Sequence, residues 1–467
     1  MSMTFALIVG NRDFFPDRLA KEGREEMLEL LGGEGFRVVC PTPEDTNFGT
    51  VETWEEAKKC AELFKEHKEE IDGVIVTLPN FGDEKGVANT LRLSGLDVPV
   101  LVHAYPDRLV ALDVANRRDS FCGKISVCNN LIQYGIPFSL TREHTVNPRE
   151  KSFQADLHWF ASVCRLMSGL KNLRLGAVGA RPAAFNTVRF SEKILESYGI
   201  SVETIDLSEI FASMDKLADA DPAVQKKVDE IKSYCDTSHV PDEKVTVIAK
   251  FALVVEGWME ENDLSATAVQ CWSSLERNLG IMPCTAMSMM SEKFLPSACE
   301  VDIMGVLAMY ALQKASQSPS ALVDWNNNYG DDPDRCVLFH CGNYAKSIFE
   351  SVEMGYGDVI STSVGKENAY GSCTGRIKEG PLTYARFTTD DATGMLRSYV
   401  GEADLTRDPL DTFGGRGVAH IPRMQDLFQF ICRQGFEHHV AINRSHVAGV
   451  FREAVETYLG AECYWHC

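Results

Sequence analysis

The sequence lacks any continuous apolar run approaching the roughly 18 to 20 residues of a membrane-spanning helix. Its longest apolar runs, such as residues 73–78, have the length of a strand. The start of the chain also lacks the basic segment that precedes the apolar stretch of a secretory signal. Since no export signal is visible, the fifteen cysteines indicate free thiols in a reducing compartment. We therefore expect a cytoplasmic protein without a membrane partner.

The chain has fewer basic residues than acidic ones. The chain has 46 lysines and arginines against 67 aspartates and glutamates, which gives a formal net charge of −21. Such a chain repels a phosphate backbone, so nucleic acid is not an expected partner. An acidic chain does favour divalent cations, although most of its carboxylates simply keep it soluble.

The common nucleotide-binding and acyl-transfer motifs are also missing. The apolar stretch that begins at Leu173 leads into Gly179 and Arg181 without the further glycines of a dinucleotide fingerprint. There is no phosphate-binding Gly-x4-Gly-Lys-Ser/Thr loop and no Gly-x-Ser-x-Gly elbow. These absences argue against nicotinamide chemistry, nucleotide hydrolysis and serine hydrolase activity.

What the chain does contain is a repeated α/β pattern. Apolar strand-like runs alternate with amphipathic helical stretches over residues 1–170, which predicts a parallel sheet covered on both faces. The pattern restarts at Leu173 with a strand, a helix expected over residues 185–198 and another strand.

From about residue 320 the pattern changes to short β-type segments broken by Gly and Asp, including one expected over residues 359–362. The predicted fold is therefore α/β: two Rossmann-like domains with parallel sheets, followed by a mainly β domain. The expected boundaries are 1–170 for the N-terminal domain, 171–320 for the central domain and 321–467 for the C-terminal domain.

Three carboxylates lie where catalysis is expected in such a fold. A strand expected over residues 266–272 delivers Glu276 into the loop that follows it, and a second loop delivers Glu300 and Asp302 to the start of an apolar helix. Ligands of open α/β sheets bind beyond the carboxyl ends of the strands, so these residues are candidate metal ligands or acid/base groups. Alternatively, Glu300 and Asp302 only cap the helix.

Histidines supply a second kind of donor. His340 ends an apolar strand, and His438, His439 and His446 lie in one C-terminal segment. Carboxylates with an imidazole suit Mn²⁺ or a similar ion. Adjacent histidines on a strand point to opposite faces, so we expect at most one of His438 and His439 to face a given site. A purely structural role is the alternative for each histidine. The residues by themselves predict a carboxylate and histidine metal site in a three-domain α/β enzyme.

The order of short motifs resembles the L-fucose isomerase and L-arabinose isomerase family, which consists of metal-dependent aldose–ketose isomerases. The resemblance is spread over most of the chain, in segments that begin at Arg12, Asp119, Gly179, Cys271, Ala298, Asp324, Phe339 and Glu437.

The resemblance implies a metal site and the residues that form it. By similarity to the fucose isomerase branch, Glu276, Asp302 and His439 would hold the ion, which we expect to be Mn²⁺ and alternatively Co²⁺ or Mg²⁺. The arabinose isomerase branch makes Glu300 and His340 second-tier candidates for the metal or the substrate, and leaves the choice between Glu300 and Asp302 open.

The expected chemistry is the transfer of a carbonyl between C1 and C2 of an open-chain sugar. A metal bound to both sugar oxygens stabilises an enediolate-type intermediate, typically by several kcal/mol. Glu276 and Asp302 would act as the base and the acid, in an order that the sequence does not determine, and each positioned proton transfer contributes about 10² to 10⁴ in rate.

Substrate-binding residues are expected at loops and element ends: Asn326 and Asn327, whose alternative is a simple turn, and Arg12, Ser120 and Arg181. Family members often complete the active site with a first domain from a neighbouring subunit, so the resemblance implies a homo-oligomer, a trimer or hexamer, in which Arg12 acts across subunits. For Arg12 the alternative is a surface arginine.

The identity of the sugar stays open at this point. The resemblance suggests L-fucose, D-arabinose or L-arabinose, whereas a phosphorylated or sulfonated hexose would require basic residues near the site, with arginine best suited to such anions. A second hypothesis is a non-catalytic sugar-binding or regulatory protein of the same fold, since fold alone does not fix function.

Overall fold

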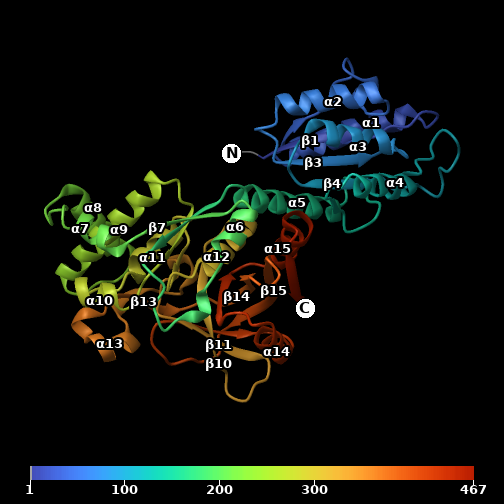
Figure 1. Cartoon of the computed structure of the whole chain (residues 1–467). Helices are drawn as coiled ribbons and strands as arrows, with labels where there is room; N and C mark the ends of the chain where they lie inside the picture. The colour runs from blue at the N-terminus through green and yellow to red at the C-terminus, as the bar shows by residue number, and fades with distance from the viewer. Residues whose placement is uncertain (1–2) are drawn as a thin grey trace. The chain divides into compact units, whose positions relative to one another are not determined.

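The computed structural model describes residues 3–467, and the chain divides into two compact units (Figure 1). Unit 1 ends at Ser168 and includes the later segment Glu453–Gly460, while unit 2 contains Gly169–Arg452 and Ala461–Cys467. The expected end of the first domain at residue 170 lies close to this boundary. The border expected at residue 320 lies inside unit 2, and the separation of residues 171–320 from 321–467 stays a prediction.

Unit 1 is built on a five-stranded parallel sheet in the order β2-β1-β3-β4-β5. Alternate side chains of β1 enter two different cores: Ala6 packs with Val87 of α3, and Leu7 packs with Met27 of α1. Both faces of the sheet are therefore buried, as a parallel sheet requires. The elements of this part of the chain are β1 (Thr4–Val9), α1 (Asp17–Gly33), β2 (Arg37–Val39), α2 (Trp54–Glu66), β3 (Gly73–Leu78), α3 (Glu84–Ser94), β4 (Val100–Ala104), α4 (Ser120–Gln133), β5 (Ser139–Leu140) and α5 (Lys151–Leu170).

Unit 2 begins with a second parallel sheet, in the order β7-β6-β8-β9. Its strands are short and apolar, and helices supply the rest of its core. The elements are β6 (Arg174–Val178), α6 (Glu192–Ser197), β7 (Ser201–Ile205), α7 (Leu207–Met214), α8 (Pro222–Tyr234), α9 (Asp242–Glu261), β8 (Ala266–Val269), α10 (Ser274–Leu279), α11 (Cys284–Glu292), β9 (Ser297–Cys299) and α12 (Ile303–Ser316).

The remainder of unit 2 is a nine-stranded, mostly antiparallel sheet in the order β12-β13-β16-β11-β10-β17-β14-β15-β18. An additional pairing between β15 and β16 closes six of these strands into a ring, which leaves those strands without open edges. The elements are β10 (Ser320–Asn328), β11 (Arg335–His340), β12 (Glu353–Tyr356), α13 (Asp358–Val364), β13 (Tyr370–Arg376), β14 (Gly380–Asp390), β15 (Met395–Thr406), β16 (Gly415–His420), α14 (Met424–Gln434), β17 (His439–Asn443), α15 (Ala448–Glu453) and β18 (Glu462–His466). The predicted fold class, two parallel α/β sheets followed by a mainly β region, is confirmed.

Helix α12 connects the two sheets of unit 2. It packs against β8 and also against β14 and β17, and twelve of its fourteen residues are buried. A helix that is apolar all round is expected when both sides are covered by protein. Its N-terminus, capped by Asp302, therefore lies between the parallel sheet and the antiparallel strands.

Two predicted elements are wrong. The helix expected over residues 185–198 is broken into a 3-10 turn, Asn186–Val188, and the short helix α6. Asn186 accepts hydrogen bonds from Arg181 and Arg189, which hold the chain before α6 out of a continuous helix. The β-type segment expected over residues 359–362 is helix α13. Its β-branched side chains favour a strand only where a partner strand is available, and none pairs with it here among residues 3–467. Within the same described range, no helix is both long and apolar enough to cross a bilayer.

Candidate functional site

The site lies at the carboxyl ends of the parallel strands of unit 2. In the order β7-β6-β8-β9 the chain runs from β6 outward in both directions, so the topological switch falls between β6 and β8. This is where α/β sheets bind their ligands. The segments that follow these strands contain Gly179, Cys271 and Glu300.

Glu300, His340 and His439 form a buried cluster whose donor atoms lie within 4.8 Å of one another. The Oε2 atom of Glu300 lies 3.6 Å from His340 Nε2 and 3.7 Å from His439 Nε2. The three residues come from the loop after β9, from the end of β11 and from the start of β17. The fold thus brings together a carboxylate and two imidazoles that are far apart in the sequence.

Glu300 is held in one orientation. Its Oε1 accepts hydrogen bonds from Trp272 Nε1 at 2.9 Å and from the Cys271 thiol at 3.4 Å. Its Oε2 accepts no hydrogen bond from any residue that the structure describes. Glu300 and Val301 both have positive φ, 56° and 57°, a strained backbone that is found preferentially at functional sites.

Charge keeps Glu300 ionised. Burial alone raises the pKa of a carboxyl group, but the neighbouring His340 and His439 more than offset this and hold the pKa of Glu300 below its ordinary value. A buried carboxylate oxygen that is ionised and accepts no hydrogen bond is a costly arrangement unless a cation binds it.

His439 is oriented by Asp302. Its Nδ1 donates to Asp302 Oδ2 at 2.8 Å, so the neutral ring carries its proton on Nδ1 and leaves the Nε2 lone pair directed at Glu300. A carboxylate behind the histidine is the usual second layer of a metal site.

Both oxygens of Asp302 have partners. Arg386 Nη1 donates to Oδ2 at 2.5 Å and Nη2 donates to Oδ1 at 3.0 Å, and the backbone N–H of Gly305 also donates to Oδ1. Burial opposes ionisation of Asp302, but Arg386 and His439 outweigh it, and its pKa lies well below the usual range. Arg386 is fully buried and also donates to Glu437.

His340 differs from His439 in the protonation of its Nε2 atom. Its Nδ1 lies 3.0 Å from the backbone N–H of Cys341, so Nε2, the atom that faces Glu300, carries a proton. Burial opposes charge on this ring, but the neighbouring Cys341 and Glu300 outweigh it and raise the pKa of His340 well above its ordinary value. The Nε2–H group of His340 is thereby suited to donate a hydrogen bond to Glu300, and Nε2 is poorly suited to coordinate a metal ion.

Glu276 is fully buried in the first turn of α10. Neither of its carboxylate oxygens has a hydrogen-bond partner among the described residues. Burial raises its pKa to about 8. Glu276 does not belong to the cluster of Glu300, His340 and His439. Cys341, whose Sγ lies 3.2 Å from His340 Nδ1, also contributes to the raised pKa of Glu276. Cys341 is therefore the residue that relates Glu276 to the cluster.

Asp324 is a polar group at the site that sequence reasoning did not select. Its Oδ1 lies 3.4 Å from His439 Nε2 and 3.5 Å from His438 Nε2. The expectation that at most one of the two adjacent histidines faces a given site is therefore wrong. His438 precedes β17, so the alternation of side chains along a strand does not apply to it. The antiparallel register, which sets Asp324 opposite His439, accounts for the contact.

Aromatic rings cover the cluster. The ring of Phe185 lies 5.5 Å from that of His439, 5.3 Å from His438 and 5.7 Å from Trp272. Phe185 lies in the segment that begins at Gly179, one of the segments in which the chain resembles the isomerase family. Sequence reasoning also missed Arg386, which carried a visible signal, since it is a charged residue flanked by the apolar residues Ala385 and Phe387 in β14.

The remaining predicted residues lie elsewhere. Arg12 and Ser120 are in unit 1: Arg12 pairs with Glu84 and donates to the carbonyl of Gly82, and the buried Ser120 hydroxyl has no partner among the described residues. Arg181 follows β6 in unit 2. Asn326 and Asn327 are exposed on β10 at a β-bulge, so they belong to a strand and not to the turn considered as their alternative.

The donor set fits a divalent cation. Glu300 Oε2 and both carboxylate oxygens of Glu276 are buried and accept no hydrogen bond from the described residues. His439 Nε2 lies 3.7 Å from Glu300 Oε2 and 3.4 Å from Asp324 Oδ1. Two carboxylates with one neutral imidazole suit Mn²⁺, Co²⁺ or Mg²⁺. A group of thiols, formed by Cys284, Cys299 and Cys341, adjoins this cluster, since Cys341 Sγ lies 3.2 Å from His340 Nδ1 and Cys299 also groups with Glu300.

Two family models match parts of this chain. Residues 6–171 match the N-terminal domain model of fucose/sulfoquinovose isomerases, and residues 338–466 match the L-fucose isomerase C-terminal domain model. The segment between the two matches contains Glu276, Glu300 and Asp302, which these models therefore do not cover.

Individual relatives extend the similarity. A sulfoquinovose isomerase from Priestia aryabhattai is 26% identical over 338 residues, which is 72% of each chain. One from Alkalicoccus urumqiensis is 26% identical over 311 residues, 66% of this chain and 68% of that protein. One from Clostridium sp. is 22% identical over 202 residues, 43% of this chain and 45% of that protein. The predicted enzyme class is confirmed and the non-catalytic alternative is set aside: the chain belongs to the fucose/sulfoquinovose isomerase family and is an aldose–ketose isomerase.

Proposed function

We propose that this enzyme converts a sulfonated aldose, of the sulfoquinovose type, into the corresponding ketose with the help of a divalent cation, Mn²⁺ in the first instance and Co²⁺ or Mg²⁺ as alternatives. The names of the relatives support the sulfonated substrate. The observation that supports the cation is the buried Glu300 Oε2, which accepts no hydrogen bond from the described residues although two imidazoles flank it.

In this proposal Glu276, Glu300 and His439 hold the cation. Glu300 replaces Asp302 in the ligand set, because both oxygens of Asp302 are already engaged by Arg386, His439 and Gly305. When bound, the cation acts as a Lewis acid that lowers the energy of negative charge on the C1 and C2 oxygens of the sugar.

Glu276 is the proposed acid/base group. Isomerisation removes a proton from the carbon next to the carbonyl and returns one to the neighbouring carbon, passing through an enediolate-type intermediate. The Glu276 carboxylate is fully buried and neither of its oxygens has a hydrogen-bond partner among the described residues, so no protein donor competes with the proton that it would move.

The surrounding residues position this machinery. Asp302 fixes the tautomer of His439, and Arg386 keeps Asp302 ionised. Trp272 holds Glu300 through its indole N–H, and Phe185 covers the His439 ring and limits the access of water.

We further propose that the enzyme acts as a homo-oligomer in which Arg12 reaches the site of a neighbouring subunit, whereas Ser120 is fully buried and does not. Unit 1 exposes large apolar side chains close in the chain to these two residues: Phe14 is 84% exposed, Leu109 90% and Val110 94%. Such apolar exposure is typical of an interaction surface.

The experiment is a turnover assay in D₂O on protein stripped with a chelator and then reloaded with Mn²⁺, Co²⁺ or Mg²⁺. Neutral, phosphorylated and sulfonated aldoses are compared by NMR. We expect ketose formation from the sulfonated aldose and deuterium at C2 of the recovered aldose, both lost on chelation and restored by metal. Failure to convert any aldose with any of the three metals would contradict the proposal.

A further inference from the structure

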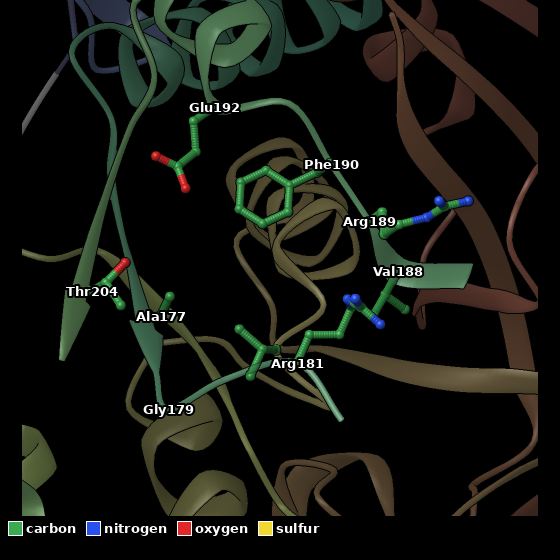
Figure 2. Close-up of a pocket in the computed structure, with 9 residues that line it drawn as sticks. Ala177, Gly179, Arg181, Val188, Arg189, Phe190, Glu192 and Thr204 are labelled. Atoms are coloured by element: carbon green, nitrogen blue, oxygen red, sulfur yellow. The ribbon is translucent and has the colours of Figure 1, made fainter. Parts of the chain in front are cut away.

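Unit 2 contains a cavity of about 230 Å³ beside the candidate site (Figure 2). It is smaller than the roughly 300 to 1,000 Å³ of sites that enclose a whole drug-sized ligand, so it suits one end of a ligand. The lining residues with a bearing on its chemistry are Arg181, Arg189, Phe190, Glu192, Thr204 and Val301.

The cavity adjoins the catalytic cluster through two chain segments. Val301, which lines it, lies between Glu300 and Asp302 in the chain. The loop after β6 places Arg181 at the cavity and, four residues later, Phe185 against the ring of His439. Two chain segments therefore connect the cavity with the cluster at which C1 and C2 of the sugar lie in the proposed function.

Two arginines line the cavity without a carboxylate partner. Arg181 Nη1 donates to Asn186 Oδ1 at 3.0 Å and to the carbonyl of Pro182 at 3.2 Å, and Arg189 Nε donates to the carbonyl of Asn186 at 2.9 Å. The hydrogen-bond partners of both guanidinium groups are neutral oxygens of Asn186 and Pro182, and neither group forms an ion pair with a described residue. By contrast, Arg386 at the same site pairs with both Asp302 and Glu437. Asn186 thus holds two guanidinium groups in place while their remaining N–H groups stay free.

Glu192 sets the charge of the cavity. Figure 2 shows its carboxylate on the side opposite Arg181, and shows the guanidinium of Arg189 directed outward beyond Val188. Arg181 and Glu192 offset each other, and Arg189 adds one positive charge at the rim, so the three side chains sum to about +1 and match a ligand with a single negative charge. A sulfonate carries one negative charge at neutral pH, whereas a phosphate monoester carries about −1.5 to −2.

We infer that this cavity is the subsite for the anionic end of the substrate, with Arg181 as its main contact and Arg189 as a second positive charge at its rim, and that it prefers a sulfonate to a phosphate. The inference rests on the proposed function. Arginine suits the task because its planar fork donates two parallel hydrogen bonds to the oxygens of such a group.

The first test compares three sugars that differ only at C6: sulfoquinovose, its uncharged 6-deoxy analogue quinovose, and glucose 6-phosphate. Each is assayed with the wild type, with Arg181→Gln, Arg181→Lys and Arg189→Gln, and with Arg433→Gln, an exposed arginine near the end of α14, as the matched control. We expect Arg181→Gln to lower the preference for sulfoquinovose over quinovose about tenfold or more, through KM, and Arg181→Lys to restore part of it. Arg189→Gln has a smaller effect in the same direction.

The second test measures binding without turnover. Metal-free protein is titrated calorimetrically with 6-deoxy-6-sulfoglucitol, an open-chain analogue that has no carbonyl. We expect the wild type and Arg433→Gln to bind it equally, and Arg181→Gln to bind it about tenfold more weakly.

The outcomes distinguish a failure of the proposed isomerase function from a failure of the proposed anion subsite. If the wild type isomerises no aldose but binds the sulfo-alditol through Arg181, the proposed function fails and the subsite stands. If the wild type isomerises sulfoquinovose and Arg181→Gln retains the full preference for it over quinovose, the subsite fails alone. A wild type that prefers glucose 6-phosphate overturns the assignment of a singly charged ligand.

Discussion

The Nδ1 atom of His439 donates a hydrogen bond to Asp302 Oδ2 over 2.8 Å, and this pairing decides which atom of His439 is free. Because the proton stays on Nδ1, Nε2 faces Glu300 with its lone pair available. Loss of such a supporting carboxylate typically costs a factor of about 10 to 100 in metal affinity.

We therefore predict that Asp302→Asn weakens Mn²⁺ binding about 10- to 100-fold without abolishing it, whereas Glu300→Gln abolishes binding at the same site. Calorimetric titration of the metal-free variants measures both. Asp411→Asn, an exposed substitution in the same unit, is the control and should bind like the wild type. Complete loss of binding in Asp302→Asn together with retention in Glu300→Gln would restore Asp302 as the ligand.

The two histidines of the cluster should behave differently. His439→Gln is expected to lose stoichiometric metal, while His340→Gln keeps the metal and loses turnover, since His340 directs an N–H toward Glu300 and its Nδ1 is already used by Cys341. Metal content after gel filtration, measured with kcat, separates the cases. Equal loss of metal in both variants would make His340 a ligand.

The buried Arg386 neutralises Asp302 and Glu437, and both carboxylates are shielded from water. Removing one partner of a buried ion network typically costs about 3 to 5 kcal/mol, because the remaining charges have no compensation. We predict this loss of unfolding free energy for Arg386→Met. Arg407→Gln, which removes an exposed pair with Glu379, should change stability by less than about 1 kcal/mol. Equal effects in urea denaturation would disprove the role assigned to Arg386.

His103 gives unit 1 a predictable response to pH. It is fully buried, with Thr77 Oγ1 at Nδ1 and the Val146 carbonyl at Nε2, and burial lowers its pKa from 6.5 to about 3. Above pH 6.5 the ring is neutral in both the folded and the unfolded chain. Below pH 6.5 the unfolded chain takes up a proton that the folded chain cannot, so stability falls as the pH falls toward 3.

At pH 5.5 the lowered pKa of His103 reduces the free energy of unfolding by about 1 to 2 kcal/mol relative to neutral pH. Urea denaturation of the wild type and of His103→Gln at pH 7.5 and 5.5 measures it. We expect the wild type to lose more stability than the variant over this interval, by about that amount. Parallel pH profiles for the two proteins would show that His103 titrates normally in the folded state.

Much of the fold could be predicted from the sequence, because local patterns dictate it. The apolar runs at residues 73–78 and 303–312 are too regular to be anything but a buried strand and a buried helix, and the change to short strands after residue 320 is a matter of composition. The wrong helix at residues 185–198 shows the limit. There the hydrogen bonds of Asn186 to Arg181 and Arg189 override local preference, and no periodicity reveals them.

The site could be predicted as a set of residue types but not in its pairing. The spacing in the sequence places Glu300 and Asp302 together at the start of a helix. Which of the two carboxylates faces His439 Nε2 depends on the positive φ angles of Glu300 and Val301. It also depends on Arg386, which binds Asp302 from a strand more than eighty residues away in the chain. Asp324 joins the site only through its register opposite His439. Such relationships arise from tertiary structure.

The central claim is that Glu276, Glu300 and His439 hold one catalytic divalent ion and that Glu276 also moves the proton. The most direct measurement is an electron paramagnetic resonance titration of metal-free wild type, Glu300→Gln and Glu276→Gln with Mn²⁺, run alongside deuterium exchange at C2 of sulfoquinovose. The account predicts one bound Mn²⁺ and exchange in the wild type, no bound ion in Glu300→Gln, and no exchange in Glu276→Gln even at saturating Mn²⁺. Exchange that continues undiminished in metal-free wild type, or in Glu300→Gln, would contradict it.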